Sequence, residues 1–158
     1  MKTPGVTFYS LQKGEAAEAE LAEVKAGGWD GPDIVDWANH LHDVADTAAL
    51  MECMDLVISV DTSMAHLAGA LARPVWILNR YDSCWRWLQD RPDSPWYPTA
   101  RLFRQSRFDD WTPVIAEVAQ GPRGPGVANS RARTRRLAEG QGTRPSAAKH
   151  PYVGSATF

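Results

Sequence analysis

The sequence is first informative through what it lacks. Its only two cysteines, Cys53 and Cys84, form no Cys-x-x-Cys pair and supply no disulfide framework, so we interpret them as free thiols. No apolar run reaches the ~18 residues that a membrane span requires. The N-terminus has no basic stretch followed by an apolar one, as a secretory signal would. We therefore expect a cytoplasmic protein without a membrane span.

Several motifs of enzyme chemistry are absent as well. The sequence has no Gly-x-Gly-x-x-Gly fingerprint, no phosphate-binding loop ending in Gly-Lys-Ser/Thr, and no Gly-x-Ser-x-Gly nucleophile motif. His40 and His42 lie close to Asp43 and Asp46, but their spacing matches no known metal-binding pattern. We therefore expect neither a bound metal nor another cofactor.

Charge is distributed unevenly along the chain. The formal net charge is −2, but from Gly121 onward seven basic residues stand against one acid, Glu139. The tail is therefore at +6 and residues 1–120 are at −8. A body this acidic lacks the basic footprint that nucleic-acid binding requires, so we expect no nucleic-acid partner for it.

The composition also divides the chain into two parts. Residues 1–120 are long enough for one domain with a hydrophobic core. Residues 121–158 are dominated by Gly, Pro, Ser, Ala and Arg, and cannot bury enough apolar surface to offset their chain entropy. We predict a disordered basic tail. A nucleic-acid-binding tail and a frameshifted coding segment are the alternatives.

Residue patterns predict alternating strands and helices. The best strand is the apolar run 56–60, followed by a helix over 64–71 that ends before Arg73-Pro74, and then by a strand over 75–78. This strand–helix–strand unit is typical of a right-handed crossover in a parallel sheet. We predict an α/β fold with an incomplete Rossmann-like parallel sheet. Further strands are predicted at 6–10, 34–35 and 101–105. Further helices are predicted over 15–25, from Asp46 or Thr47 to 54, and over 113–119. The segment 79–100 is predicted as an ordered, aromatic-rich loop.

A candidate site follows the best strand. Ligands of open parallel sheets bind beyond the carboxyl ends of the strands, and Asp61-Thr62-Ser63 stands at that edge, where a helix begins. The free N–H groups and positive dipole of a helix N-terminus favour a phosphate there, with hydroxyls of Thr62 and Ser63 and the ring of His66 within reach. The alternative is that these residues only cap the helix and that His66 is structural.

The run 55–71 resembles the signature of family 9 glycosyltransferases, which include the heptosyltransferases. The resemblance covers about residues 4–119. Further segments resemble a subgroup whose transferase domain usually follows tetratricopeptide repeats: Ser10 to Gly14, Arg73 to Trp76, Cys84 to Leu88, Asp93 to Pro98 and Arg101 to Gln105.

The resemblance implies the C-terminal, donor-binding half of a GT-B fold, with a nucleotide-sugar as the ligand and no metal. The residues it assigns to the donor diphosphate and sugar are Asp61, Thr62, Ser63, Met64 and His66, with Gln12 and Lys13 near the nucleotide. It assigns no role to Trp85-Arg86-Trp87 or to Ser94-Pro95-Trp96-Tyr97-Pro98, and we interpret the former as a packing cluster.

The resemblance also implies missing parts. The first strand of the donor half and the whole acceptor half, which carries the catalytic base, have no counterpart in the sequence. We therefore expect a fragment that binds the donor but does not transfer sugar alone, and that works with a separate acceptor-domain or tetratricopeptide-repeat chain. A non-catalytic interaction module and a general phosphate-binding α/β domain are the alternatives.

Overall fold

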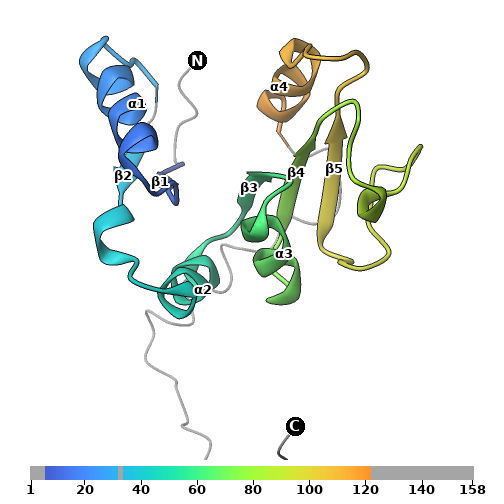
Figure 1. Ribbon diagram of the computed structural model, residues 1–158, viewed down its shortest axis with the longest axis horizontal. Coiled ribbons are helices and arrows are strands. Elements are labelled where there is room, and N and C mark those ends of the chain that lie inside the picture. The colour runs from blue at the N-terminus through green and yellow to red at the C-terminus, as the bar shows by residue number, and fades with distance from the viewer. Residues whose placement is uncertain (1–5, 32–33, 122–158) are drawn as a thin grey trace, which may run out of the picture.

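The computed structural model describes residues 6–31 and 34–121, and these form an α/β fold (Figure 1). The predicted fold class is confirmed, whereas the predicted tail lies outside the described residues. In the described ranges, no helix has the length and apolar character that crossing a membrane requires. The elements are β1 (Phe8–Ser10), α1 (Glu15–Ala26), β2 (Ile34–Asp36), η1 (Ala38–His40), α2 (Val44–Cys53), β3 (Val57–Val60), α3 (Ser63–Ala70), β4 (Val75–Asn79), η2 (Trp85–Trp87), β5 (Ala100–Arg104) and α4 (Thr112–Ala119).

The C-terminal part of the fold is a three-stranded parallel sheet in the order β3-β4-β5. Val57 pairs with Val75, and Val75 pairs with Ala100, so the three strands start in register. Helix α3 connects β3 to β4. The predicted strand–helix–strand unit is therefore confirmed, and it brings the carboxyl end of β3 to the edge from which α3 departs.

The N-terminal part is a separate parallel pair, β1 and β2, in which Tyr9 pairs with Val35. Figure 1 shows β1 on the side of β2 that faces β3. In a Rossmann sheet the third, second, first, fourth, fifth and sixth strands lie side by side in that order. Strands β2 and β1 match the first two positions and β3 to β5 match the last three. The described residues place no strand between β1 and β3, so the predicted incomplete parallel sheet is observed as two separate sheets.

Apolar residues on the two faces of the β3-β4-β5 sheet form two clusters. On one face, Val57, Val75 and Ile77 pack with Ala65 and Ala68 of α3. On the other face lies a smaller cluster of Trp76, Phe103 and Val114, the last from α4. Alternate residues of β4 thus enter opposite clusters, as strand geometry requires. This layering fixes α3, and with it the N-terminus of that helix, against the sheet.

Helix α2 begins earlier than the sequence pattern predicted. Its N-cap is Asp43, whose carboxylate accepts a hydrogen bond from the Asp46 amide at 2.9 Å. The Asp46 carboxylate in turn accepts from the His42 amide at 2.9 Å. The predicted cap at Asp46 or Thr47 is therefore wrong. These two bonds place the N-cap three residues upstream of Asp46, in a variant of the capping box in which the second bond goes to the residue before the N-cap.

The aromatic-rich segment 79–100 packs on the sheet, as predicted, through one anchoring side chain. Trp87 of η2 is fully buried in the cluster formed by α3 and the sheet. Arg104 of β5 holds the same turn, because its guanidinium donates to the Ser83 hydroxyl at 2.6 Å and to the Trp87 carbonyl. Burial lowers the pKa of Arg104, and the charge of Asp90 opposes that shift.

Replacing Trp87 tests this anchor. We expect Trp87→Ala to lower the free energy of unfolding by about 3–5 kcal/mol, because a buried indole is lost and a cavity remains. The matched control is Trp85→Ala in the same turn, which should change the free energy of unfolding by less than about 0.5 kcal/mol, since Trp85 is 71% exposed. Urea denaturation followed by circular dichroism measures the stability of both variants. Equal losses of stability in the two variants would contradict the anchoring role of Trp87.

Candidate functional site

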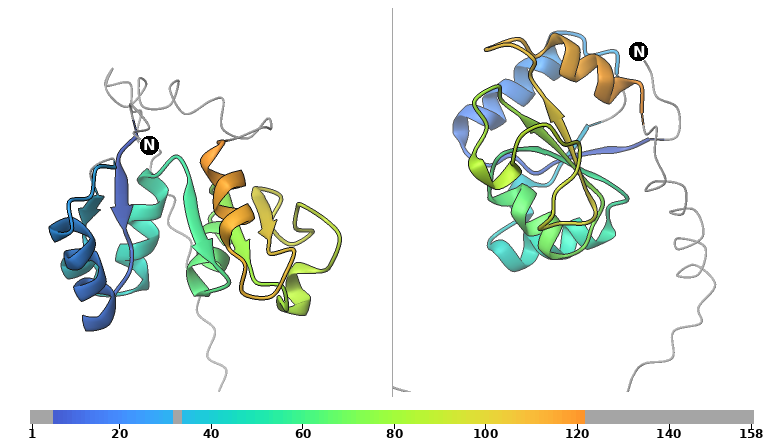
Figure 2. Two further views of the ribbon diagram at one scale, coloured as in Figure 1. Left: turned by 90° about the horizontal axis from the view of Figure 1, so that it is seen from above. Right: turned by 90° about the vertical axis from the view of Figure 1, so that its right-hand side faces the viewer.

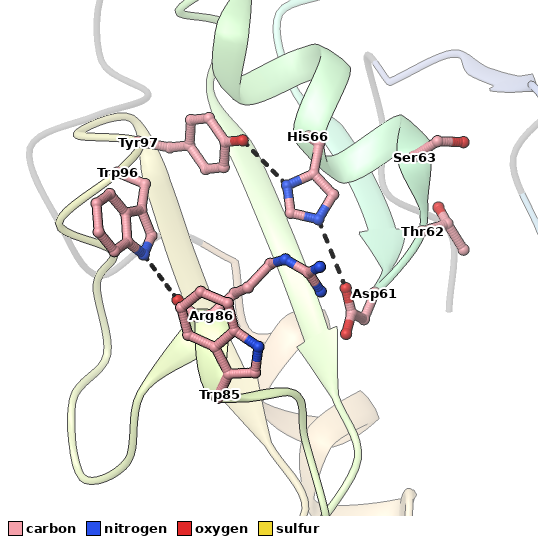
Figure 3. A pocket seen from close by; sticks show the side chains of 8 residues that line it. All are labelled: Asp61, Thr62, Ser63, His66, Trp85, Arg86, Trp96 and Tyr97. Atoms are coloured by element: carbon pink, nitrogen blue, oxygen red, sulfur yellow. Dashed lines mark hydrogen bonds and ion pairs between the residues drawn. The ribbon is translucent and has the colours of Figure 1, made fainter.

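A pocket of about 740 Å³ opens where β3 ends and α3 begins (Figure 3). Two walls face each other across it. One wall comes from the β3–α3 junction, and the other comes from η2 and the segment that precedes β5. The lining residues are Asp61, Thr62, Ser63, His66, Trp85, Arg86, Trp96 and Tyr97. Four predicted site residues are thus brought together with four that the resemblance left without a role.

The N-terminus of α3 is not capped by a side chain. Thr62 occupies the N-cap position in an extended conformation, but no side-chain hydrogen bond caps the helix. The Thr62 hydroxyl lies 3.1 Å from that of Ser59. The first turn of α3 therefore keeps N–H groups without intrahelical partners, and the helix dipole makes this end positive. This geometry argues against the alternative that Asp61-Thr62-Ser63 only caps the helix.

His66 lines the pocket and lies between two polar groups. Its Nδ1 lies 3.0 Å from the Tyr97 hydroxyl, and its Nε2 lies 3.8 Å from a carboxylate oxygen of Asp61. The first distance is a hydrogen bond, whereas the second is too long for one. The imidazole also stacks on the buried Trp87, with ring centroids 5.0 Å apart. The ring is thus oriented on one side by packing, while its edge toward Asp61 faces the pocket.

Gly69 explains how Tyr97 reaches His66. A Cβ atom at position 69 would lie 2.5 Å from Cγ of Tyr97, which is far inside van der Waals contact. The tyrosine ring therefore lies directly against the backbone of α3. Sequence reasoning missed both residues, although the run of small residues in the predicted helix was a signal that something packs closely there.

The opposite wall presents two exposed indoles and one cation. Trp85 is 71% exposed and Trp96 is 59% exposed, whereas Trp87 between them in sequence is buried. The Arg86 guanidinium lies over the Trp85 ring, 5.4 Å from its centroid. The interpretation of Trp85-Arg86-Trp87 as a packing cluster is therefore confirmed for Trp87 and wrong for Trp85.

Three other predicted site residues lie elsewhere. Met64 packs against the core cluster, because its position on α3 turns it toward the sheet. Lys13 donates a hydrogen bond from Nζ to the Leu41 carbonyl, and the backbone N–H of Gln12 donates one to Ser10 Oγ at 3.4 Å. None of the three lines the pocket. Within residues 6–31 and 34–121, no group of three metal-ligating side chains is placed to hold an ion.

Comparison with known proteins agrees with the resemblance. The family model for glycosyltransferase family 9 (heptosyltransferase) matches residues 6–104. The chain therefore belongs to glycosyltransferase family 9. It is similar to Protein FlbA of Caulobacter vibrioides, with 35% identity over 124 residues, covering 75% of this chain and 20% of that protein. The chain thus spans about a fifth of the length of this relative. No solved structure matches the chain.

Gly69→Ala tests the contact between α3 and Tyr97. Inside a helix this substitution ordinarily stabilises by about 0.5–1 kcal/mol. Here we expect a loss of about 1–3 kcal/mol, because the new methyl group displaces the tyrosine ring. The control is the same substitution in a Tyr97→Ala background, where the ordinary gain should return. Stabilisation by Gly69→Ala in both backgrounds, measured by urea denaturation, would contradict the contact.

Proposed function

We propose that this chain supplies the donor-binding half of a family 9 glycosyltransferase and holds the diphosphate of a nucleotide-sugar at the N-terminus of α3. The uncapped first turn of α3, opening into a pocket lined by Thr62 and Ser63, supports this proposal most directly. Backbone N–H groups, two hydroxyls and the helix dipole all favour an anion at that place. Asp61 and His66, on the same wall, then face the sugar that the diphosphate carries.

The proposed chemistry follows from the charge that develops during sugar transfer. When the bond between the sugar carbon and the diphosphate oxygen breaks, negative charge accumulates on the leaving diphosphate. Preorganised N–H donors at the α3 N-terminus would stabilise that charge without a bound metal. Deprotonation of the acceptor hydroxyl needs a general base on the acceptor side. We therefore propose that the chain binds donor but transfers sugar only with a separate acceptor-domain or tetratricopeptide-repeat chain.

The helix-end site is tested by calorimetric titration of the full chain with ADP, UDP, GDP and their sugar conjugates. We expect one of these ligands to bind and Thr62→Ala/Ser63→Ala to weaken it by about 10- to 100-fold, because two hydrogen bonds to a charged group are lost. Ser106→Ala, which removes an exposed hydroxyl outside the pocket, should leave the affinity unchanged. Equal affinity for inorganic phosphate would favour a general phosphate-binding domain, and an undiminished affinity of the double variant would refute the site.

The free edges of β1 and β3 favour a second candidate function, that of an interaction module. Among the described residues, β1 pairs only with β2 and β3 pairs only with β4. Ile58 and Val60 of β3 are 43% and 47% exposed. Unpaired strand edges with apolar side chains are templates for pairing with another chain. Such pairing could replace or accompany donor binding.

A lysine on β3 tests this second candidate. If the edge pairs with another copy of the chain, the purified protein should form a concentration-dependent oligomer that Ile58→Lys reduces, since charge on an edge strand opposes pairing. Ile115→Lys on the exposed side of α4 is the matched control and should have no effect. Light scattering after size exclusion measures the mass. A monomer at every concentration, or equal effects of both lysines, would count against pairing at β3.

A further inference from the structure

We propose that Trp85 and Arg86 form the second half of the ligand site, in which Arg86 binds phosphate oxygens and the Trp85 indole stacks on a ring of the ligand. The inference rests on the proposed function of the α3 wall, which would hold the same phosphates from the other side. The ligand class is thus a diphosphate that carries at least one ring. No role for these two residues followed from the sequence.

Exposure is the first observation that carries this inference. Two large indoles, Trp85 and Trp96, are left mostly in water at the rim of one pocket. A tryptophan is among the largest apolar groups a protein can bury, so a pair of exposed ones beside a cavity indicates a binding surface. Burial of the neighbouring Trp87 shows that this turn can place an indole in the core. Trp85 is therefore outside because the turn directs it to the pocket.

The second observation is that the wall is held in place before any ligand arrives. Trp96 Nε1 donates a hydrogen bond to the Arg86 carbonyl at 3.0 Å, which ties the two pocket segments together. On the inner side, the Arg104 guanidinium binds the Ser83 hydroxyl and the Trp87 carbonyl. The turn is thus fixed on both flanks, so little conformational freedom would be lost when a ligand binds.

The third observation is the charge on Arg86. No acidic side chain of the described residues forms an ion pair with it, whereas Arg80, Arg91 and Arg101 each have one. Figure 3 shows its guanidinium extending past the Trp85 ring toward the side of the pocket where Asp61 lies. The α3 dipole supplies only about half a positive charge, which leaves most of a diphosphate charge without compensation. A guanidinium binds phosphate oxygens in pairs and adds a full charge.

The position of Trp85 indicates that its indole stacks on a ring of the ligand. Arg86 lies over this indole, yet Trp85 remains mostly exposed, so a second flat group can stack on it. A nucleobase and the apolar face of a sugar are the two rings that a nucleotide-sugar offers. Both would use the same stacking chemistry, and ligands that differ by one ring distinguish them.

Three probes and three variants of the full chain test the inference by calorimetry. The probes are inorganic pyrophosphate, UDP and UDP-glucose. If another base binds better, the corresponding nucleoside diphosphate and its sugar conjugate replace the last two. We expect Arg86→Gln to weaken every probe by about 10- to 150-fold, with partial recovery in Arg86→Lys. We expect Trp85→Ala to leave pyrophosphate unchanged and to weaken ring-bearing ligands by about 5- to 150-fold. If Trp85→Ala weakens the binding of UDP, the ring that stacks on Trp85 is the base. If it weakens only the binding of UDP-glucose, that ring is the sugar.

Matched controls and outcomes separate this inference from the proposed function. Arg107→Gln and Phe108→Ala remove an exposed cation and an exposed ring outside the pocket and should change no affinity. If Thr62→Ala/Ser63→Ala weakens binding but the Trp85 and Arg86 variants do not, the inference is overturned and the α3 site stands. If only the Trp85 and Arg86 variants weaken binding, the inference stands and the α3 site fails. If no probe binds to the folded chain, both are refuted.

Discussion

Insertion of Trp87 into the core is the contact on which the rest of the pocket depends. The buried indole stacks on His66 and thereby joins the aromatic-rich segment to α3. The Trp87 ring also lies 6.2 Å from the Tyr97 ring, centroid to centroid, and it anchors the turn that carries Arg86. This apolar contact thus helps to assemble a polar site from two segments that are about twenty residues apart in sequence. The Trp87 side chain thus belongs to the core and at the same time contacts His66 of the pocket.

The sequence predicted those parts of the structure whose cause is local. The apolar run before Asp61, the small residues of the next helix and the Arg73-Pro74 break each act within a few residues, so β3, α3 and β4 were predictable, and with them the place of Thr62 and Ser63. The hydrogen bond between Tyr97 and His66 spans 31 residues and has no periodic signal. The exposure of Trp85 beside the burial of Trp87 depends on a short turn that no propensity encodes. These two features could be recognised only from the three-dimensional structure.

The pocket combines two ways of binding an anion that differ in their physics. The helix end offers a fixed dipole and backbone N–H groups, which lie on a rigid element and cannot move away. The guanidinium of Arg86 offers a full charge on a side chain that lies over an indole and donates a hydrogen bond to the Cys84 sulfur at 3.0 Å. The first favours a single position of the anion, and the second adds attraction over a longer range. Together they would let a multiply charged ligand be attracted first and positioned afterwards.

The division of the strands into two sheets has a consequence for how the chain opens. Helix α1 has no buried residue, and Phe8 and Tyr9 of β1 are substantially exposed, so little apolar surface holds the β1–α1–β2 unit in place. The β3-β4-β5 sheet, by contrast, has a packed cluster on each face. Amide protons of the first unit should therefore exchange with solvent through a low-energy partial opening, while those of β4 await global unfolding. All the residues that line the pocket lie between Asp61 and Tyr97, outside the β1–α1–β2 unit, so a partial opening of that unit should leave the pocket walls folded.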